Sequence, residues 1–172
     1  MEFGEFKQHL IEITKDIDAC TEGFKLLQKA ESWLDLCLIV RDSFEWCVEN
    51  KLITPELIQE HWLDCKKANI YCNESVQNGF IIVTSGNDID VCGHSFVIAL
   101  GNAHVTAYDT TYVVAKDDAE VEAYDHCYIK ACDNSKVTCH DYASATPVGN
   151  PDIVVDKGQV CHDFYYSEPI GQ

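Results

Sequence analysis

The chain has 172 residues and a formal net charge of −17 at pH 7. This charge argues against direct binding to nucleic acid, because contact with a phosphate backbone requires Lys and Arg to displace counterions. Hydrophobic residues make up 47% of the chain and charged residues 24%, a composition typical of folded domains. No apolar run approaches the roughly 20 residues of a membrane span, and the first ten residues lack the pattern of a signal peptide. We therefore expect a cytoplasmic protein with no membrane contact.

Residues 1–78 are predicted to form a small acidic α-helical domain. Its apolar residues recur at helical spacing, first at Phe6, Leu10, Ile13 and Ile17. Asp42 is a candidate cap for a short helix, and Pro55 after Thr54 is a start signal for another. This last helix is expected to bury four apolar side chains, Leu57, Ile58, Trp62 and Leu63. Acidic residues outnumber basic residues by 15 to 8 in this part of the chain, a net of −7.

The ten cysteines are best explained as reduced thiols. Without an export signal a disulfide framework is not favoured, and no C-x-x-C pair is present to begin a zinc site. An occasional bridge or a metal site is the open alternative. Five of the cysteines stand among helical apolar positions, namely Cys20, Cys37, Cys47, Cys65 and Cys72.

After Asn73 the periodicity changes from helical to alternating, and from Ile89 an eight-residue pattern repeats without insertion. The first octad is IDVCGHSF and the last complete one is VTCHDYAS. First positions are β-branched: Ile89, Val97, Val105, Val113, Val121, Ile129 and Val137. Third positions are Val91, Ala99, Ala107, Ala115, Ala123, Ala131 and Cys139, and seventh positions are also small. Fifth positions begin with Gly93 and Gly101 and continue with Asp109, Asp117, Asp125, Asp133 and Asp141.

Small or β-branched residues at alternate positions suit a narrow interior in which strands stack about 4.8 Å apart. Positions sixteen residues apart resemble each other more than positions eight apart, since alternate octads carry Phe96, Tyr112 and Tyr128. We predict an α+β protein in which residues 79–172 form a flattened octapeptide-repeat β-solenoid with a C-terminal tail. Each coil is expected to contain two octads, about 16 residues. The helical domain is expected to cap this solenoid and block end-to-end stacking.

The solenoid is predicted to have one aromatic face and one more charged face. A ladder of stacked tyrosines stabilises any sheet, so a purely structural role is one explanation. Tyrosine is also enriched at interface hot spots, so the alternative is that this face binds a target or a second copy of the chain. The candidate partner-binding residues are Phe96, Tyr108, Tyr112, Tyr124, Tyr128, Asp118, Glu120 and Glu122.

The aspartate column at the fifth octad positions has three interpretations. Each carboxylate can bond backbone N–H groups at a corner and turn the chain, a role that suits Asp. Turns of a parallel β-roll can instead bind calcium, although the paired glycines of that nonapeptide repeat are missing here. The third interpretation is an exposed acidic ladder that imitates the spacing of phosphates.

Catalytic signatures are missing from the sequence. It contains no G-x-S-x-G, no phosphate-binding glycine loop and no H-E-x-x-H. Three adjacent Cys and His pairs, His126-Cys127, Cys139-His140 and Cys161-His162, belong to the repeat or adjoin it. Alternation sends adjacent side chains to opposite faces, which separates a nucleophile from its base. We expect no enzyme activity, no cofactor and no metal ion.

The octad resembles the V-x-A-x-D-x-A-x arrays of uncharacterised proteins from phages and gut bacteria. The helical residues Cys20, Glu22, Trp33, Cys37 and Trp46 loosely resemble the Cys and Trp pattern that precedes such arrays. This resemblance implies a β-solenoid and a mobile-element context, and no activity. By physical analogy alone, the acidic chain is also similar to pentapeptide-repeat solenoids that imitate duplex DNA.

The leading hypothesis is therefore a non-enzymatic inhibitor or adaptor from a phage or other mobile element. It would act in the host cytoplasm on a basic protein target, such as a CRISPR effector or another nucleic-acid-binding defence protein. The alternatives are a structural or oligomerising module, including a homodimer through the aromatic face, and a calcium-dependent binding module.

Overall fold

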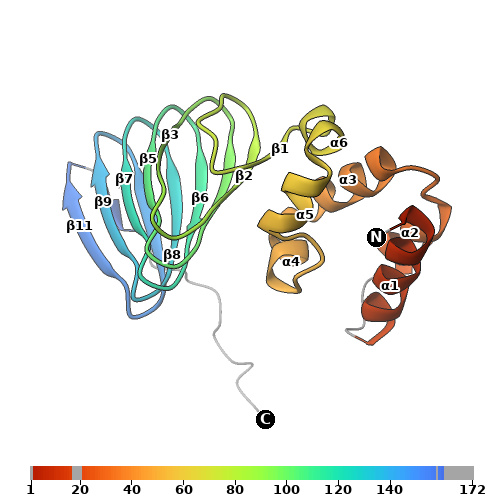
Figure 1. Cartoon of the computed structure of the whole chain (residues 1–172). Coiled ribbons are helices and arrows are strands. Elements are labelled where there is room, and N and C mark those ends of the chain that lie inside the picture. The colour runs from red at the N-terminus through yellow and green to blue at the C-terminus, as the bar shows by residue number, and fades with distance from the viewer. Residues whose placement is uncertain (1, 17–20, 158, 161–172) are drawn as a thin grey trace, which may run out of the picture. The chain divides into compact units, whose positions relative to one another are not determined.

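The computed structural model describes residues 2–16, 21–157 and 159–160, in two compact units that comprise residues 1–71 and 72–172 (Figure 1). Residues 72–78, which the sequence places with the helices, belong to the second unit. There Gln77 forms a β-bridge with Cys92, and the Asp90 amide donates to the Ser75 hydroxyl at 3.1 Å. In the described part of the chain, no helix combines the length and the apolar character needed to cross a bilayer.

The first unit contains six described helices: α1 (Phe3–Asp16), α2 (Thr21–Lys29), α3 (Trp33–Asp42), α4 (Phe44–Glu49), α5 (Pro55–Glu60) and α6 (Trp62–Lys67). Helix α3 begins with a capping box, in which Ser32 and Asp35 satisfy each other's backbone amides. Thr54 caps α5 and Pro55 stands in its first turn, as the sequence predicts. Asp42, in contrast, is the last residue of α3, and Ser43 is the N-cap of α4.

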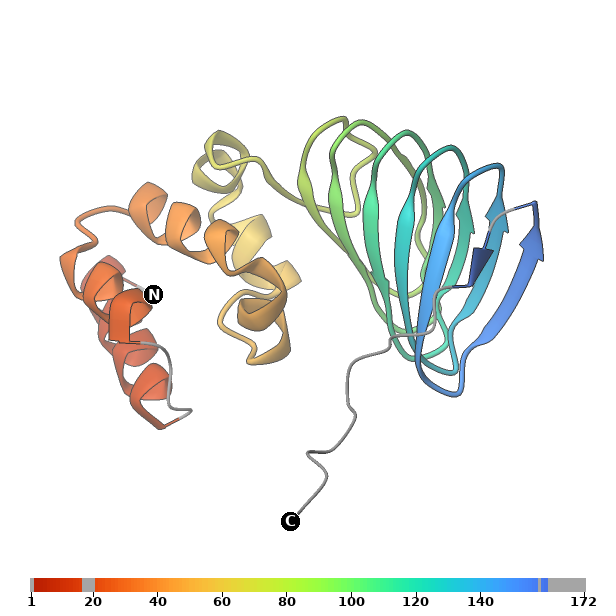
Figure 2. The same cartoon turned by 180° about the vertical axis from the view of Figure 1, so that it is seen from behind.

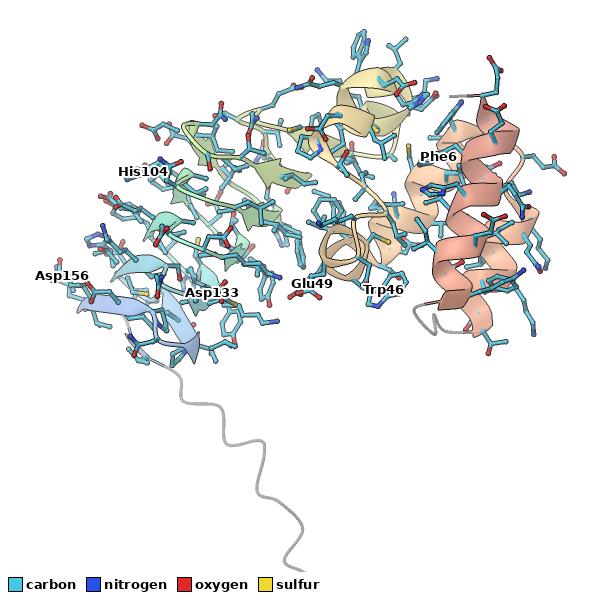
Figure 3. All side chains as sticks on the ribbon, turned by 60° about the horizontal axis from the view of Figure 1, so that its bottom comes forward. Phe6, Trp46, Glu49, His104, Asp133 and Asp156 are labelled. Atoms are coloured by element: carbon cyan, nitrogen blue, oxygen red, sulfur yellow. The ribbon has the colours of Figure 1, made fainter. Side chains whose placement is uncertain are left out.

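The helical core differs from the prediction after Pro55. Ile58 is 4% exposed, but Trp62 and Leu63 are 51% and 56% exposed because the expected single helix breaks at His61, which turns α6 away from the line of α5. Phe6 and Leu10 of α1 are buried as expected. Phe6, which is labelled in Figure 3, packs against Trp33 with ring centroids 5.0 Å apart. Ile17 and Cys20 lie outside the described residues.

The second unit is a parallel β-solenoid of about five turns (Figures 1 and 2). One sheet has the strand order β1-β2-β4-β6-β8-β10-β12, and the other has the order β11-β9-β7-β5-β3. The strands of the longer sheet are β1 (Ile70–Cys72), β2 (Phe80–Val83), β4 (Phe96–Ala99), β6 (Tyr112–Ala115), β8 (Tyr128–Asp133), β10 (Ser144–Gly149) and β12 (Gln159–Val160). Those of the shorter sheet are β3 (Asp88–Val91), β5 (His104–Ala107), β7 (Glu120–Ala123), β9 (Lys136–His140) and β11 (Asp152–Asp156).

The register of both sheets confirms a coil of sixteen residues. Val97 pairs with Val113 in one sheet, and Val105 pairs with Val121 in the other. First and third octad positions from Val91 to Cys139 are at most 3% exposed, and each fully buried valine or isoleucine stabilises the fold by about 1.5–3 kcal/mol. The seventh positions are buried as well, and two of their hydroxyls bond backbone carbonyls: Ser95 donates to Cys92 and Thr111 to Tyr108. Residues 161–172, which include the predicted tail, lie outside the described residues.

Candidate functional site

The fifth octad position forms the corner between the two sheets. The corner aspartates have left-handed backbone conformations, with φ between 51° and 61°, and Gly93 and Gly101 occupy the equivalent corners of earlier coils. A left-handed residue is costly for most side chains, but Asp tolerates it because its short polar side chain can bond nearby backbone groups. The switch from Gly to Asp along the repeat therefore keeps one backbone conformation while it adds a carboxylate to each corner.

The corner carboxylates bond the backbone of the preceding coil. Oδ2 of Asp109 accepts a hydrogen bond from the Gly93 amide at 2.9 Å, and Oδ2 of Asp125 accepts one from the Asp109 amide at 3.0 Å. On the opposite corner, Asp117 and Asp133 accept from the amides of Gly101 and Asp117 at 2.9 and 3.1 Å. Asn78 differs from these aspartates, since its Oδ1 accepts from the amide of His94 in the following coil, at 2.8 Å. The structure thus gives the aspartate column the backbone-bonding role.

These five carboxylates also remain accessible to solvent. Asp109, Asp117, Asp125, Asp133 and Asp141 are all exposed, and none of them forms an ion pair within the described residues. Asp133, at the end of β8, illustrates the corner position in Figure 3. Backbone hydrogen bonds hold four of these carboxylates in place, namely those of Asp109, Asp117, Asp125 and Asp133, so the two corners present rigid rows of acidic side chains.

The two edges of the solenoid differ in the residues beside these corners. We call the edge at Gly93, Asp109, Asp125 and Asp141 the aromatic edge, because Tyr108 and Tyr124 precede its corners while Tyr112 and Tyr128 follow them. The rings stack from coil to coil, with 5.3 Å between the centroids of Tyr108 and Tyr124 and 5.4 Å between those of Tyr112 and Tyr128. We call the edge at Gly101, Asp117 and Asp133 the polar edge; Asn102, Asp118 and Asn134 are exposed there.

The structure places the five predicted aromatic residues along one edge and not on one face. Phe96, Tyr112 and Tyr128 begin strands of the seven-stranded sheet, whereas Tyr108 and Tyr124 follow strands of the five-stranded sheet. The cause is the corner at the fifth octad position, because it lies between the fourth and eighth positions and so places them on different sheets. Ile98 and Val114 of the seven-stranded sheet are fully buried, although alternation points them away from the interior of the coils.

Charged side chains on the outer face of the five-stranded sheet pair with one another. Glu120 accepts from Lys136 at 2.7 Å and contacts His104 Nε2 at 2.7 Å, so these three side chains link three successive coils. The Lys136 and His104 bonds lower the pKa of Glu120, and the Glu120 bond raises the pKa of Lys136. Tyr124 donates to Glu122 at 3.1 Å, which raises the pKa of that tyrosine. Among the predicted partner-binding acids, Glu120 is thus compensated, while Asp118 at the polar edge is exposed and outside any ion pair of the described residues.

Adjacent cysteine and histidine side chains of the solenoid diverge, as alternation requires. Cys127 and Cys139 are 1% and 0% exposed inside the coils, whereas His126 is exposed and His140 is half-buried outside. The pair Cys161-His162 lies outside the described residues. Within the described ranges, no three His, Cys, Asp or Glu side chains gather in a group suited to a metal ion.

One group of reactive side chains in the helical unit was not predicted. The sulfur atoms of Cys37 on α3 and Cys65 on α6 are 3.7 Å apart, and both residues are buried. His61 stacks on Trp33 with ring centroids 3.5 Å apart. Its buried Nε2 forms no hydrogen bond with the described residues, and Oε1 of Glu60 lies 3.7 Å from it. No sequence signal could have found this group, because its members are spread over two helices and a helix break.

Comparison with known proteins adds no relative to these observations: no protein-family model, curated protein or solved structure matches this chain.

Proposed function

We propose that this chain is a non-enzymatic protein-binding module whose corner carboxylates bind a basic surface of another protein. The observation that carries this proposal is the rigid arrangement of four exposed corner aspartates, Asp109, Asp117, Asp125 and Asp133, each held by a backbone amide of the preceding coil. Groups that are already fixed in their bound geometry lose little conformational entropy on association. Complementary charge also speeds the encounter with a basic partner.

The finer proposal is that the solenoid imitates nucleic acid. Neighbouring carboxylates of one corner are separated by about 4.8 Å, the distance between strands, which is of the same order as the roughly 3.4 Å axial rise per phosphate of a DNA strand. The net charge of −17 supports this proposal. The resemblance to octad arrays of phages further suggests an inhibitor that a mobile element produces in the host cytoplasm. Its target would be a nucleic-acid-binding defence protein such as a CRISPR effector.

The test is the binding of purified CRISPR effectors, free of nucleic acid, to the immobilised chain at about 50 and 200 mM salt, a range in which phosphate-type contacts weaken strongly. The decisive variant changes Asp109, Asp117, Asp125 and Asp133 to Asn. Asn retains a carbonyl oxygen that can accept the backbone bond, so only the charge is lost. We expect binding that falls with salt and is lost in this variant.

A matched control removes four exposed charges outside the corners, with Gln at Glu31 and Asn at Asp42, Asp88 and Asp90. This variant should retain most of the binding. Binding that ignores salt, or that the two variants weaken equally, contradicts recognition through the corners.

The second candidate function is an oligomerising structural module. It is favoured by β11, the last strand of the five-stranded sheet, on which Val154 and Val155 are 54% and 39% exposed. An open sheet edge with apolar side chains is a template for pairing with another chain. However, Asp152 and Asp156 flank these valines, and two negative charges at an edge oppose such pairing.

A further inference from the structure

The pair Cys37 and Cys65 has the geometry of a dithiol that can close to a disulfide. Their sulfur atoms are 3.7 Å apart, although the residues are 28 positions apart in the sequence. Cys37 is 6% exposed and Cys65 is 2% exposed, so the contact is a fixed part of the packing between α3 and α6. A disulfide needs sulfur atoms about 2.05 Å apart, which requires only a small approach of the two side chains.

A small cavity gives an oxidant a place beside these sulfurs. It has a volume of about 30 Å³, and Cys37, Cys65, His61 and Trp33 are among the residues that line it. A volume of this size holds one small polar molecule such as water or hydrogen peroxide. His61, one of the residues that line this cavity, brings an imidazole ring to an otherwise apolar site.

The two thiols are not equivalent. The contact with Cys37 lowers the pKa of Cys65. The contact with Cys65 raises the pKa of Cys37, and burial raises it further. Cys65 is therefore the first of the pair to become a thiolate, the form that attacks an oxidant. Cys47 of α4 provides the contrast, since burial raises its pKa to about 12.

We propose that Cys37 and Cys65 are a peroxide-sensitive dithiol that links α3 to α6 on oxidation. The Cys65 thiolate attacks one oxygen of hydrogen peroxide, the O–O bond breaks, and the released hydroxide takes up a proton to become water. Cys37 then attacks the sulfenic acid sulfur of Cys65, forms the S–S bond and displaces the second oxygen, which also leaves as water. In sum, two thiols lose two electrons and two protons, and one peroxide is reduced to two waters.

The experiment treats the reduced full-length chain with hydrogen peroxide, alkylates the remaining thiols and maps the peptides by mass spectrometry. We expect a cross-linked peptide pair containing Cys37 and Cys65 that is lighter by two hydrogens and returns to two thiols on reduction. The cross-linked protein should melt at a higher temperature than the reduced protein, because the bridge constrains the unfolded chain.

Two variants control this result. Cys65→Ser should give no cross-link at Cys37, whereas Cys47→Ser, which removes another buried thiol, should leave the cross-link unchanged. Peptide mapping of the chain with its native sequence tests the cross-link even if a variant fails to fold. If Cys37 and Cys65 are still alkylated after other cysteines have been oxidised, or if either one pairs with a different cysteine, the proposal is wrong.

Discussion

The backbone amide of Asp109 donates a hydrogen bond to Oδ2 of Asp125, sixteen residues later, at 3.0 Å. Both residues have a left-handed backbone, with φ of 61° and 53°. One side chain therefore satisfies the corner of the preceding coil while its own backbone turns the next corner. This relation repeats along both edges. The aspartates that make the solenoid acidic are therefore the same residues that hold its coils together.

Asp125→Ala should destabilise the protein by about 1–3 kcal/mol, because it leaves the Asp109 amide unpaired and places a Cβ-bearing residue without a polar side chain in the left-handed region. Asp125→Asn should cost far less, since its amide oxygen accepts the same bond. Urea unfolding of the two variants measures the difference. Equal stability of the alanine and asparagine variants would show that the corner bond contributes little.

The interior should reject larger side chains. Ala115 is fully buried at a third octad position between Ala99 and Ala131 of the neighbouring coils. Ala115→Val adds two methyl groups to this column, and overpacking of this kind costs about 1–3 kcal/mol. Thr106, on the outer face of β5, is the matched control, since Thr106→Val adds no volume to the interior. Thermal melting should separate the two variants, and equal melting temperatures would mean that the interior is loosely packed.

The Glu120 ion pairs should give a small pH dependence. Because the pKa of Glu120 is lower in the folded state, its stabilisation is present above the unfolded pKa of about 4.5 and is lost as the pH falls through the folded value. The gap in melting temperature between the native chain and Glu120→Gln should therefore close on acidification from pH 7. Since Glu120 is exposed, the gap should be small and should shrink with salt. A gap that widens in acid would contradict this assignment.

Loss of charge at β11 should promote self-association. In the double variant Asp152→Asn and Asp156→Asn, the exposed Val154 is no longer flanked by negative charge. We expect a larger mass by light scattering at high protein concentration. The same double variant with Val154→Lys should return to the mass of the native chain. If the first variant keeps the native mass, the two acids do not protect this edge.

Calcium should leave the melting temperature unchanged at millimolar concentration. The backbone bonds of Asp109, Asp117, Asp125 and Asp133 already engage one oxygen of each carboxylate. A cation that bound the native corners would have to raise stability by mass action. A melt with calcium, compared with one in chelator, detects such a rise, and a clear upward shift would restore the calcium interpretation.

The octad pattern predicted the solenoid because every coil places small or β-branched residues at the same alternate positions in its interior. Val105 and Val121 occupy equivalent positions in the sequence and pair in the structure. The distribution of the aromatic residues was harder to predict, because the sequence shows which residues point outward but not where a corner divides them. Tyr108 and Tyr112 are four positions apart and belong to different sheets for this reason.

The helical unit was predicted less well, since helical spacing alone cannot place a break. Residues from Pro55 to Lys67 fit one amphipathic helix, yet the structure interrupts it at His61. The contact between Cys37 and Cys65 depends on how α3 and α6 pack, and no local pattern encodes that packing. The structure of the periodic part can therefore be predicted from the residue type at each repeat position. The structure of the helical part depends on contacts between helices, which the sequence pattern does not reveal.

The sixteen-residue register also limits how such a chain can change in length. Loss or gain of a whole coil would keep every later residue in its own sheet, with like stacked on like. Loss or gain of one octad would preserve the valine and alanine interior but exchange the sheets downstream. With one octad gained after Glu120, for example, Tyr128 would follow Glu120 where it now follows Tyr112, and the aromatic and polar edges would trade places partway along the molecule. Evolution by duplication is thus constrained to even numbers of octads.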